Sequence, residues 1–192
     1  MHRYLALLFG AVLAAGCAPQ QAVQPAEPQP QYRMDATVRD LMDSMVDPGA
    51  DFIWESVETI VSAKGIEEKR PRTDEEWKEV RRHGIMLLEA SNALLMPGRR
   101  VARPGEKADE PAVELAPEQI QELIDKDRAS WVKYAEELHD STMRTFKAIE
   151  AKDADGLLAT SDAIDRACEN CHMHYWYPND KPPAATGQKS KY

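Results

Sequence analysis

Apolar side chains spaced three and four residues apart limit the fold of this chain more than any other feature. The spacing is clearest in residues 73–94, where it indicates a helix with one buried face. Thr73 and Glu76 fit a capping box, in which each side chain accepts from a free backbone donor. Pro97 and Gly98 end the segment. The expected buried positions are Trp77, Val80, Gly84, Leu87, Ser91 and Leu94.

Three further segments, residues 36–63, 117–151 and 153–175, carry the same helical period. Pro48 interrupts the first, and it predicts either a kink or a split with Asp47 as a new N-cap. We find no β-hairpin signal and no internal repeat. The expected buried positions are Val38, Met42, Met45, Ile53, Val57 and Ile60 in the first of these segments, Ile120, Leu123, Trp131, Tyr134, Leu138 and Phe146 in the next, and Leu157, Ser161, Ile164, Cys168, Cys171 and Tyr175 in the last.

Four amphipathic helices with mostly short connections predict an all-α fold, an antiparallel four-helix bundle over residues 36–177. The alternative is an irregular helical bundle in which Pro48 adds a fifth, short helix. Asp153 or Asp155 can cap the last helix. Residues 178–192 carry no core-forming side chains and are expected to be a disordered tail.

The first 17 residues have the character of an export signal. Arg3 precedes an apolar run that is too short to span a bilayer as a mature helix, and small residues follow it up to Cys17. The string "LAAGC" resembles the cleavage box of bacterial lipoproteins, in which the cysteine becomes the first mature residue and carries lipid. This resemblance implies lipidation of Cys17 and a periplasmic protein anchored to a membrane. The alternative is an ordinary signal peptide that contains a cysteine.

Residues 18–35 are rich in proline and glutamine and lack the aliphatic side chains needed for a core. They are expected to be a disordered tether. The chain has 192 residues and a formal net charge of −9, which argues against nucleic acid as a partner because phosphate binding needs clustered Lys and Arg.

Cys168, Cys171 and His172 form the pattern C-x-x-C-H, which is typical of covalent haem attachment. Two thiols three residues apart on a helix share one face, within reach of the two vinyl groups at one edge of a porphyrin. The histidine that follows can supply an axial ligand to the iron. The motif predicts one covalent haem c, with both cysteines as thioethers and His172 as the proximal ligand.

Other chemistries fit these residues less well. A zinc site needs further ligands, yet no other cysteine follows Cys17, and His83 and His139 belong to separate segments. A redox C-x-x-C pair usually follows a strand of a βαβ unit, and none is evident. A disulfide between cysteines three apart within a helix would be strained.

A single C-x-x-C-H at the end of the last helix of a bundle resembles cytochrome c-prime and its low-spin relatives. The resemblance covers residues 36–176 and includes Tyr175, since the family prefers an aromatic three places after the histidine. It implies a cytochrome c-prime-like bundle, with Tyr175 beside the cofactor. The family often has Arg or Lys directly after that aromatic, whereas this chain has Trp176.

The ligand on the other face of the iron decides the function. In an up-down-up-down bundle the end of the fourth helix lies beside the start of the first, so Met42 or Met45 is expected near the iron. His172 lies about one turn from the end of the last helix, so its partner should lie about one turn into the first helix, which favours Met42. Met34 and Met96 are poorer candidates. Low-spin relatives use a methionine of the first helix. The alternative role for these methionines is core filling.

Two arginines, Arg99 and Arg100, follow the second helix at the end expected to hold haem, where they could pair with the propionates. An ordinary solvated loop is the alternative.

Iron ligated by histidine and methionine is closed to substrates, so the prediction is an electron-transfer cytochrome rather than an enzyme, with an unidentified redox partner protein. One alternative is a five-coordinate haem protein that binds NO or CO in a sensor or protective role. Another is a haem-free helical interaction module on a membrane tether. The family resemblance also implies a homodimer formed through the first two helices.

Overall fold

The computed structural model describes residues 32–179, which fall within one compact unit. They are mostly helical, with one small two-stranded sheet. The predicted helical character is therefore confirmed. The predicted signal segment, most of the tether and most of the tail lie outside the described residues. No helix among the described residues is long and apolar enough to cross a membrane.

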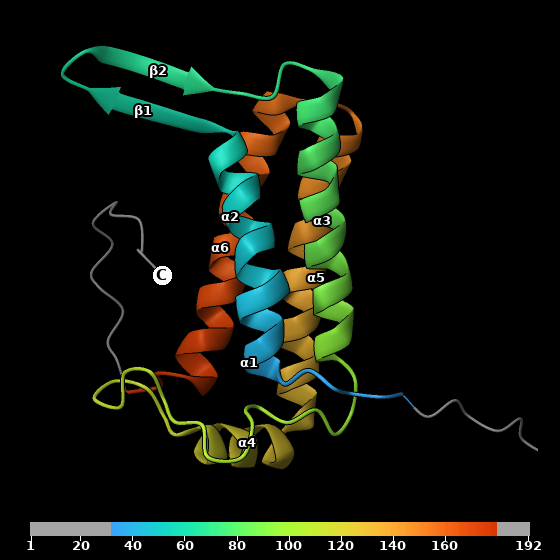
Figure 1. Cartoon of the computed structure of the whole chain (residues 1–192), viewed down its shortest axis with the longest axis vertical. Helices are drawn as coiled ribbons and strands as arrows, with labels where there is room; N and C mark the ends of the chain where they lie inside the picture. The colour runs from blue at the N-terminus through green and yellow to red at the C-terminus, as the bar shows by residue number, and fades with distance from the viewer. Residues whose placement is uncertain (1–31, 180–192) are drawn as a thin grey trace, which may run out of the picture. The chain divides into compact units, whose positions relative to one another are not determined.

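The longest helices lie side by side with short α2 (Figure 1). α2 (Asp47–Ser56) and α6 (Ala154–Tyr175) contact each other, and each also contacts one of the two central helices, α3 (Asp74–Leu94) and α5 (Arg128–Glu150). α3 and α5 contact each other in turn. These helices enclose the apolar core.

α3 forms as its sequence predicts. The Thr73 side chain accepts from the Glu76 backbone N–H at 3.2 Å, and the Glu76 carboxylate accepts from the Thr73 N–H at 2.9 Å. All six positions expected on its buried face are buried. Gly84 allows a close approach of α3 to α5, because an added Cβ there would lie 2.9 Å from the Phe146 ring on α5.

The chain passes Pro48 without the predicted N-cap. α1 (Val38–Leu41) continues into a π-helical turn, η1 (Met42–Val46), and then into α2. The Asp47 N–H donates to the Met42 carbonyl, and the Asp47 side chain caps nothing. The wide turn ends two residues before Pro48, which has no N–H to give to a normal helical ladder. Asp47 as an N-cap was therefore wrong.

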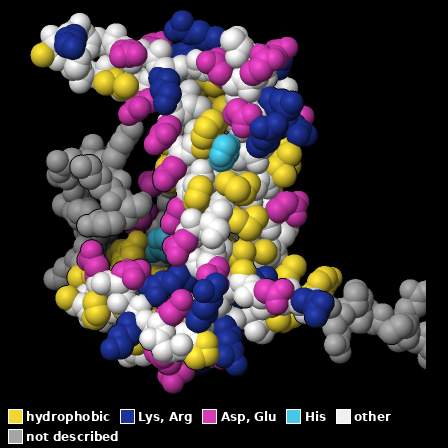
Figure 2. Space-filling model, viewed as in Figure 1, with side chains coloured by type: hydrophobic (Ala, Val, Ile, Leu, Met, Phe, Trp, Pro, Cys, Tyr) yellow, Lys and Arg dark blue, Asp and Glu magenta, His cyan; other side chains and the backbone are white. Residues whose placement is uncertain are grey.

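The first helical segment ends at Ser56 and not at residue 63, and a hairpin follows that the sequence analysis missed. β1 (Glu58–Ser62) pairs antiparallel with β2 (Gly65–Lys69). The β-branched residues of β1 favour extended backbone, and Gly65 takes a positive φ of 123° at the turn. Ile60, expected in the core, is exposed. Figures 1 and 2 show the hairpin projecting from the helices with apolar and charged side chains on its surface.

The third predicted helix is two helices. α4 (Pro117–Lys126) ends at Asp127, whose backbone is not helical, and α5 begins at the next residue. The Asp127 carboxylate accepts from the Ser130 backbone N–H at 3.1 Å and from its hydroxyl at 2.7 Å. An aspartate that bonds its own following turn competes with a continuous helix, which explains the break. α4 lies across the lower ends of the other helices in Figure 1.

Candidate functional site

The fourth predicted helix, α6, brings both cysteines to its inner side. Asp153, one of the two predicted caps, accepts from the Gly156 N–H at 3.0 Å. Cys168 and Cys171 are free thiols and half buried. They continue the row of buried residues formed by Leu157, Ser161, Ile164 and Tyr175.

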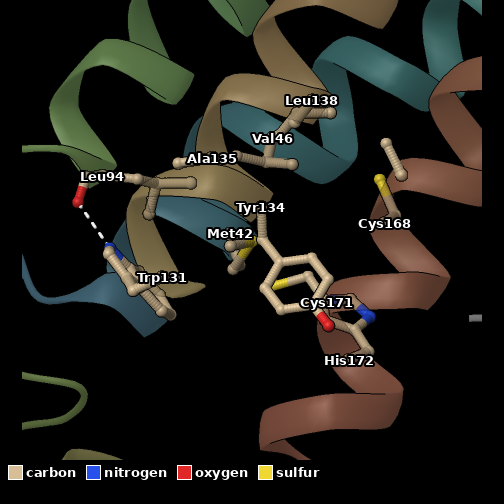
Figure 3. Close-up of a pocket in the computed structure, with 11 residues that line it drawn as sticks. Met42, Val46, Leu94, Trp131, Tyr134, Ala135, Leu138, Cys168, Cys171 and His172 are labelled. Carbon is tan, nitrogen blue, oxygen red and sulfur yellow. Dashed lines mark hydrogen bonds between the residues drawn. The ribbon is translucent and has the colours of Figure 1, made fainter. Parts of the chain in front are cut away.

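A small cavity, with space of about 20 Å³ for water-sized probes, lies beside these thiols (Figure 3). Its wall combines residues from α3, α5, α6 and the α1–η1 segment. Trp131 is held in that wall because its Nε1–H donates to the Leu94 carbonyl at 2.8 Å. The lining residues are Met42, Val46, Leu94, Trp131, Tyr134, Ala135, Leu138, Ala167, Cys168, Cys171 and His172.

Of the methionines that the sequence offers, Met42 is the one that lines this pocket. It is the first residue of the π-helical turn. Met45 packs against the core but does not line the pocket. Met96 lies elsewhere, where its sulfur accepts from Arg99 at 3.3 Å. The structure thus brings Met42, both cysteines and His172 to one cavity from opposite elements (Figure 3).

His172 is walled by aromatic side chains. Its ring centroid lies 5.7 Å from that of Trp176 and 6.0 Å from that of Tyr177. Burial lowers the pKa of His172, while the carboxylate of Glu114 acts in the opposite direction. The imidazole is therefore neutral at pH 7, which is the form that binds metal ions.

The thiols also stay neutral in this environment. Burial raises the pKa of Cys168 and of Cys171 to about 12. The charges of Asp47 and Glu137 act in the same direction on Cys168 and Cys171 respectively. The site is therefore an apolar cavity that presents two protonated thiols, a neutral imidazole and a thioether.

Arg99 does not have the role expected from the sequence. Its guanidinium donates to the Ala93 carbonyl at 3.0 Å and to the Ala36 carbonyl, so it joins the end of α3 to the chain before α1. Neither Arg99 nor Arg100 lines the pocket. Arg100 is exposed, and its carbonyl accepts from the Val38 N–H at 2.8 Å. The sequence could not reveal the contacts of Arg99 with Ala36 and of Arg100 with Val38, because they join residues about 60 positions apart.

The rings of Tyr134, His174 and Tyr175 pack on one another at or behind the pocket wall. Tyr134 lines the pocket. His174 is exposed, and its ring packs on Tyr175 at a centroid distance of 4.6 Å. Tyr175 is fully buried behind the pocket wall, with its ring 5.3 Å from that of Trp131.

Sequence reasoning did not identify the apolar wall formed by Val46, Ala135 and Ala167. Each lies one helical turn from a predicted core or site residue, and that periodicity was the available signal.

Within residues 32–179, no three His, Cys, Asp or Glu side chains gather in a way that could hold a metal ion. Cys17 lies outside the described residues. Comparisons with protein-family models, with curated proteins and with solved structures find no match for this chain.

Proposed function

We propose that this protein is an exported c-type cytochrome with one covalent haem, acting in electron transfer. The observation that carries the proposal is the single pocket that joins Cys168, Cys171 and His172 on α6 to Met42 on the facing segment. These are the side chains that haem attachment and six-coordinate iron require.

The residues present fit a haem group. Two thiols at positions i and i+3 of α6 supply the thioethers, and the neutral imidazole of His172 supplies a nitrogen ligand. Met42 offers a sulfur ligand, which raises a haem potential relative to a second histidine. When bound, haem supplies reversible one-electron transfer. Val46, Leu138 and the other apolar wall residues exclude water, and the aromatic rings beside His172 hold its orientation.

The arrangement of α2, α3, α5 and α6 supports a finer assignment of the fold as an antiparallel four-helix bundle of the cytochrome c-prime type. Each of these helices contacts two of the others, as neighbours around a bundle do. The hairpin and α4 would be additions to that plan. The proposal further includes a periplasmic location, a lipid anchor on Cys17, a protein redox partner and pairing of two copies through the first two helices.

A haem stain after denaturing electrophoresis tests covalent attachment. The chain is produced in a host with an active haem-attachment system, beside a Cys168→Ala, Cys171→Ala double variant. We expect the unaltered chain to stain and the double variant not to stain, because only thioether bonds survive denaturation. Absence of staining in the unaltered chain would refute the proposal and favour a haem-free interaction module.

Visible spectra of the oxidised and reduced protein test Met42 as the distal ligand. We expect a low-spin spectrum that becomes high-spin in Met42→Ala and stays low-spin in the matched control Met45→Ala. A low-spin spectrum that persists in Met42→Ala would exclude this ligand. A high-spin spectrum in the unaltered protein, with ready binding of CO, would instead support the alternative of a five-coordinate haem protein that binds NO or CO.

A further inference from the structure

The outer edge of β1 is open in the part of the chain that the structure describes. β1 pairs with β2 and with no other strand, and no backbone hydrogen bond joins residues 58–62 to a segment outside the hairpin. Every residue of the two strands except Glu58 is exposed. Figure 1 shows the hairpin extending away from the helices. An open strand edge presents unpaired N–H and C=O groups to another strand that can align with it.

The two strands of the hairpin differ in charge. β2 carries three charged residues in succession, at positions 67–69, and charged side chains are a common protection of a strand edge against pairing. β1 carries one charged residue, Glu58 at its start, and its other four residues are uncharged. Three of those four are β-branched, which favours extended backbone. The unprotected edge of the hairpin is therefore that of β1.

The hairpin also carries apolar side chains that cover nothing. Val61 and Ile66 lie directly opposite each other across the strands, so they share one face of the sheet. They are 76% and 72% exposed, more than any other large hydrophobic residue that the structure describes. Figure 2 shows apolar side chains on the surface of the hairpin. A two-stranded hairpin is at best marginally stable by itself, and a further strand beside β1 would both pair its edge and extend its apolar face.

We propose that β1 pairs antiparallel with β1 of a second copy of this chain, around a two-fold axis at Val61, to form a four-stranded sheet. In this register Val61 lies opposite Val61 of the second copy. Because each is also opposite its own Ile66, the four side chains form one continuous apolar row across the sheet. A two-fold axis makes the contact self-complementary, so one uncharged edge is sufficient for both copies.

The charges at the ends of the strand fit the same register. Glu58 and Lys64 each lie three positions from Val61, on opposite sides, so the two-fold axis brings Glu58 of one copy to Lys64 of the other. Neither residue forms an ion pair within residues 32–179. The pairing therefore supplies two charge pairs that the single chain lacks. This contact is separate from pairing through α2 and α3, and it does not depend on haem.

The proposed contact is small. Each copy contributes one five-residue strand, whereas a standard-size protein interface has about 20–30 residues a side. We therefore expect a weak dimer, whose fraction rises with protein concentration between about 10 µM and about 1 mM in sedimentation equilibrium.

Cysteine cross-linking tests the register. The full chain is prepared as Val61→Cys and as the matched control Ile66→Cys, whose position is equally exposed on the same face. Opposite residues of paired strands lie within disulfide range, whereas position 66 lies about 14 Å, three strand spacings, from its equivalent in the second copy. Under mild oxidation we expect Val61→Cys to form the linked dimer at least about 5-fold faster than Ile66→Cys. The unaltered chain gives the background from its own cysteines, and equal rates in the two variants would overturn the proposal.

A charge placed on the axis tests the dimer itself. Val61→Lys puts two like charges opposite each other on the shared edge, so it should weaken association at least about 10-fold. The control, Val113→Lys, replaces an exposed valine away from the hairpin and should leave association unchanged. An unchanged dimer fraction in Val61→Lys, or a monomer at every concentration in the unaltered chain, would refute the pairing. If Val61→Lys disrupts the hairpin, the cross-linking rates of the two cysteine variants still decide.

Discussion

At the residue scale, Asp47 at the start of α2 couples stability to pH. Burial raises the pKa of its carboxyl to about 6, and the charges of Asp51 and Asp43, one turn away on either side, act in the same direction. No Lys or Arg among residues 32–179 forms an ion pair with these three aspartates. The folded state therefore holds a proton on Asp47 more tightly than the unfolded state does.

The sign of this linkage leads to a prediction. Between about pH 4 and pH 6 the folded state binds more protons than the unfolded state, so the contribution of Asp47 to stability falls as pH rises through that window. Asp47→Asn should raise the free energy of unfolding at pH 7 by up to about 1 kcal/mol after allowance for solvent screening, and by much less at pH 4. Urea unfolding at both pH values measures it, with Asp162→Asn on exposed α6 surface as control. An equal gain at both pH values would contradict the proposed cause.

At the scale of elements, the packing of α3 on α5 depends on Gly84. A Cβ at this position would lie 2.9 Å from the Phe146 ring and 3.2 Å from the Ile149 side chain, so the two helices approach more closely here than any larger residue permits. Gly84→Val should lower the free energy of unfolding by about 1–3 kcal/mol through overpacking. The control, Glu89→Val, lies on the exposed side of the same helix. Thermal unfolding of the two variants should differ clearly, and equal midpoints would show that Phe146 can move aside without cost.

The hairpin is the element least coupled to the rest of the structure. Val61 and Ile66 pair across its strands but are 76% and 72% exposed. A two-stranded hairpin that buries so little surface contributes little to stability. Replacing residues 58–69 with a short Gly-Ser linker should leave the helical circular dichroism and the haem stain intact. A loss of either signal would show that the hairpin supports the helices, through Arg70 and its ion pair with Asp155, more than its exposure suggests.

At the scale of the whole molecule, a lipid anchor at Cys17 is proposed, and no helix among the described residues is long and apolar enough to cross a membrane. If Cys17 carries lipid, Cys17→Ser should move the protein from the membrane fraction to the soluble periplasmic fraction. Fractionation with immunodetection measures this, and the mass of the mature N-terminus provides an independent check. Retention of Cys17→Ser in the membrane fraction would exclude the lipid anchor as the cause of attachment.

Much of this protein was predictable because the information is local. The capping box of Thr73 and Glu76, the buried face of α3 and the shared face of Cys168 and Cys171 each depend on side chains within a few turns of one helix. The same local rules failed where two of them competed. Residues 57–61 have a helical apolar spacing and also β-branched side chains, and Asp127 can cap a new helix within an apparently continuous one.

What the amino-acid sequence determined by itself is the helical class, the start of α3 and the shared face of Cys168 and Cys171 on α6, because all of these follow from backbone hydrogen bonds and helix period. Only the tertiary structure decided that Met42 rather than Met45 lines the pocket, since the π-helical turn sets which side chain faces α6. Only packing between distant segments directed Arg99 to the Ala36 carbonyl and left the buried Tyr175 hydroxyl without a partner among the described residues. Side-chain direction at a site built from four segments is a property of their packing, and no single segment encodes it.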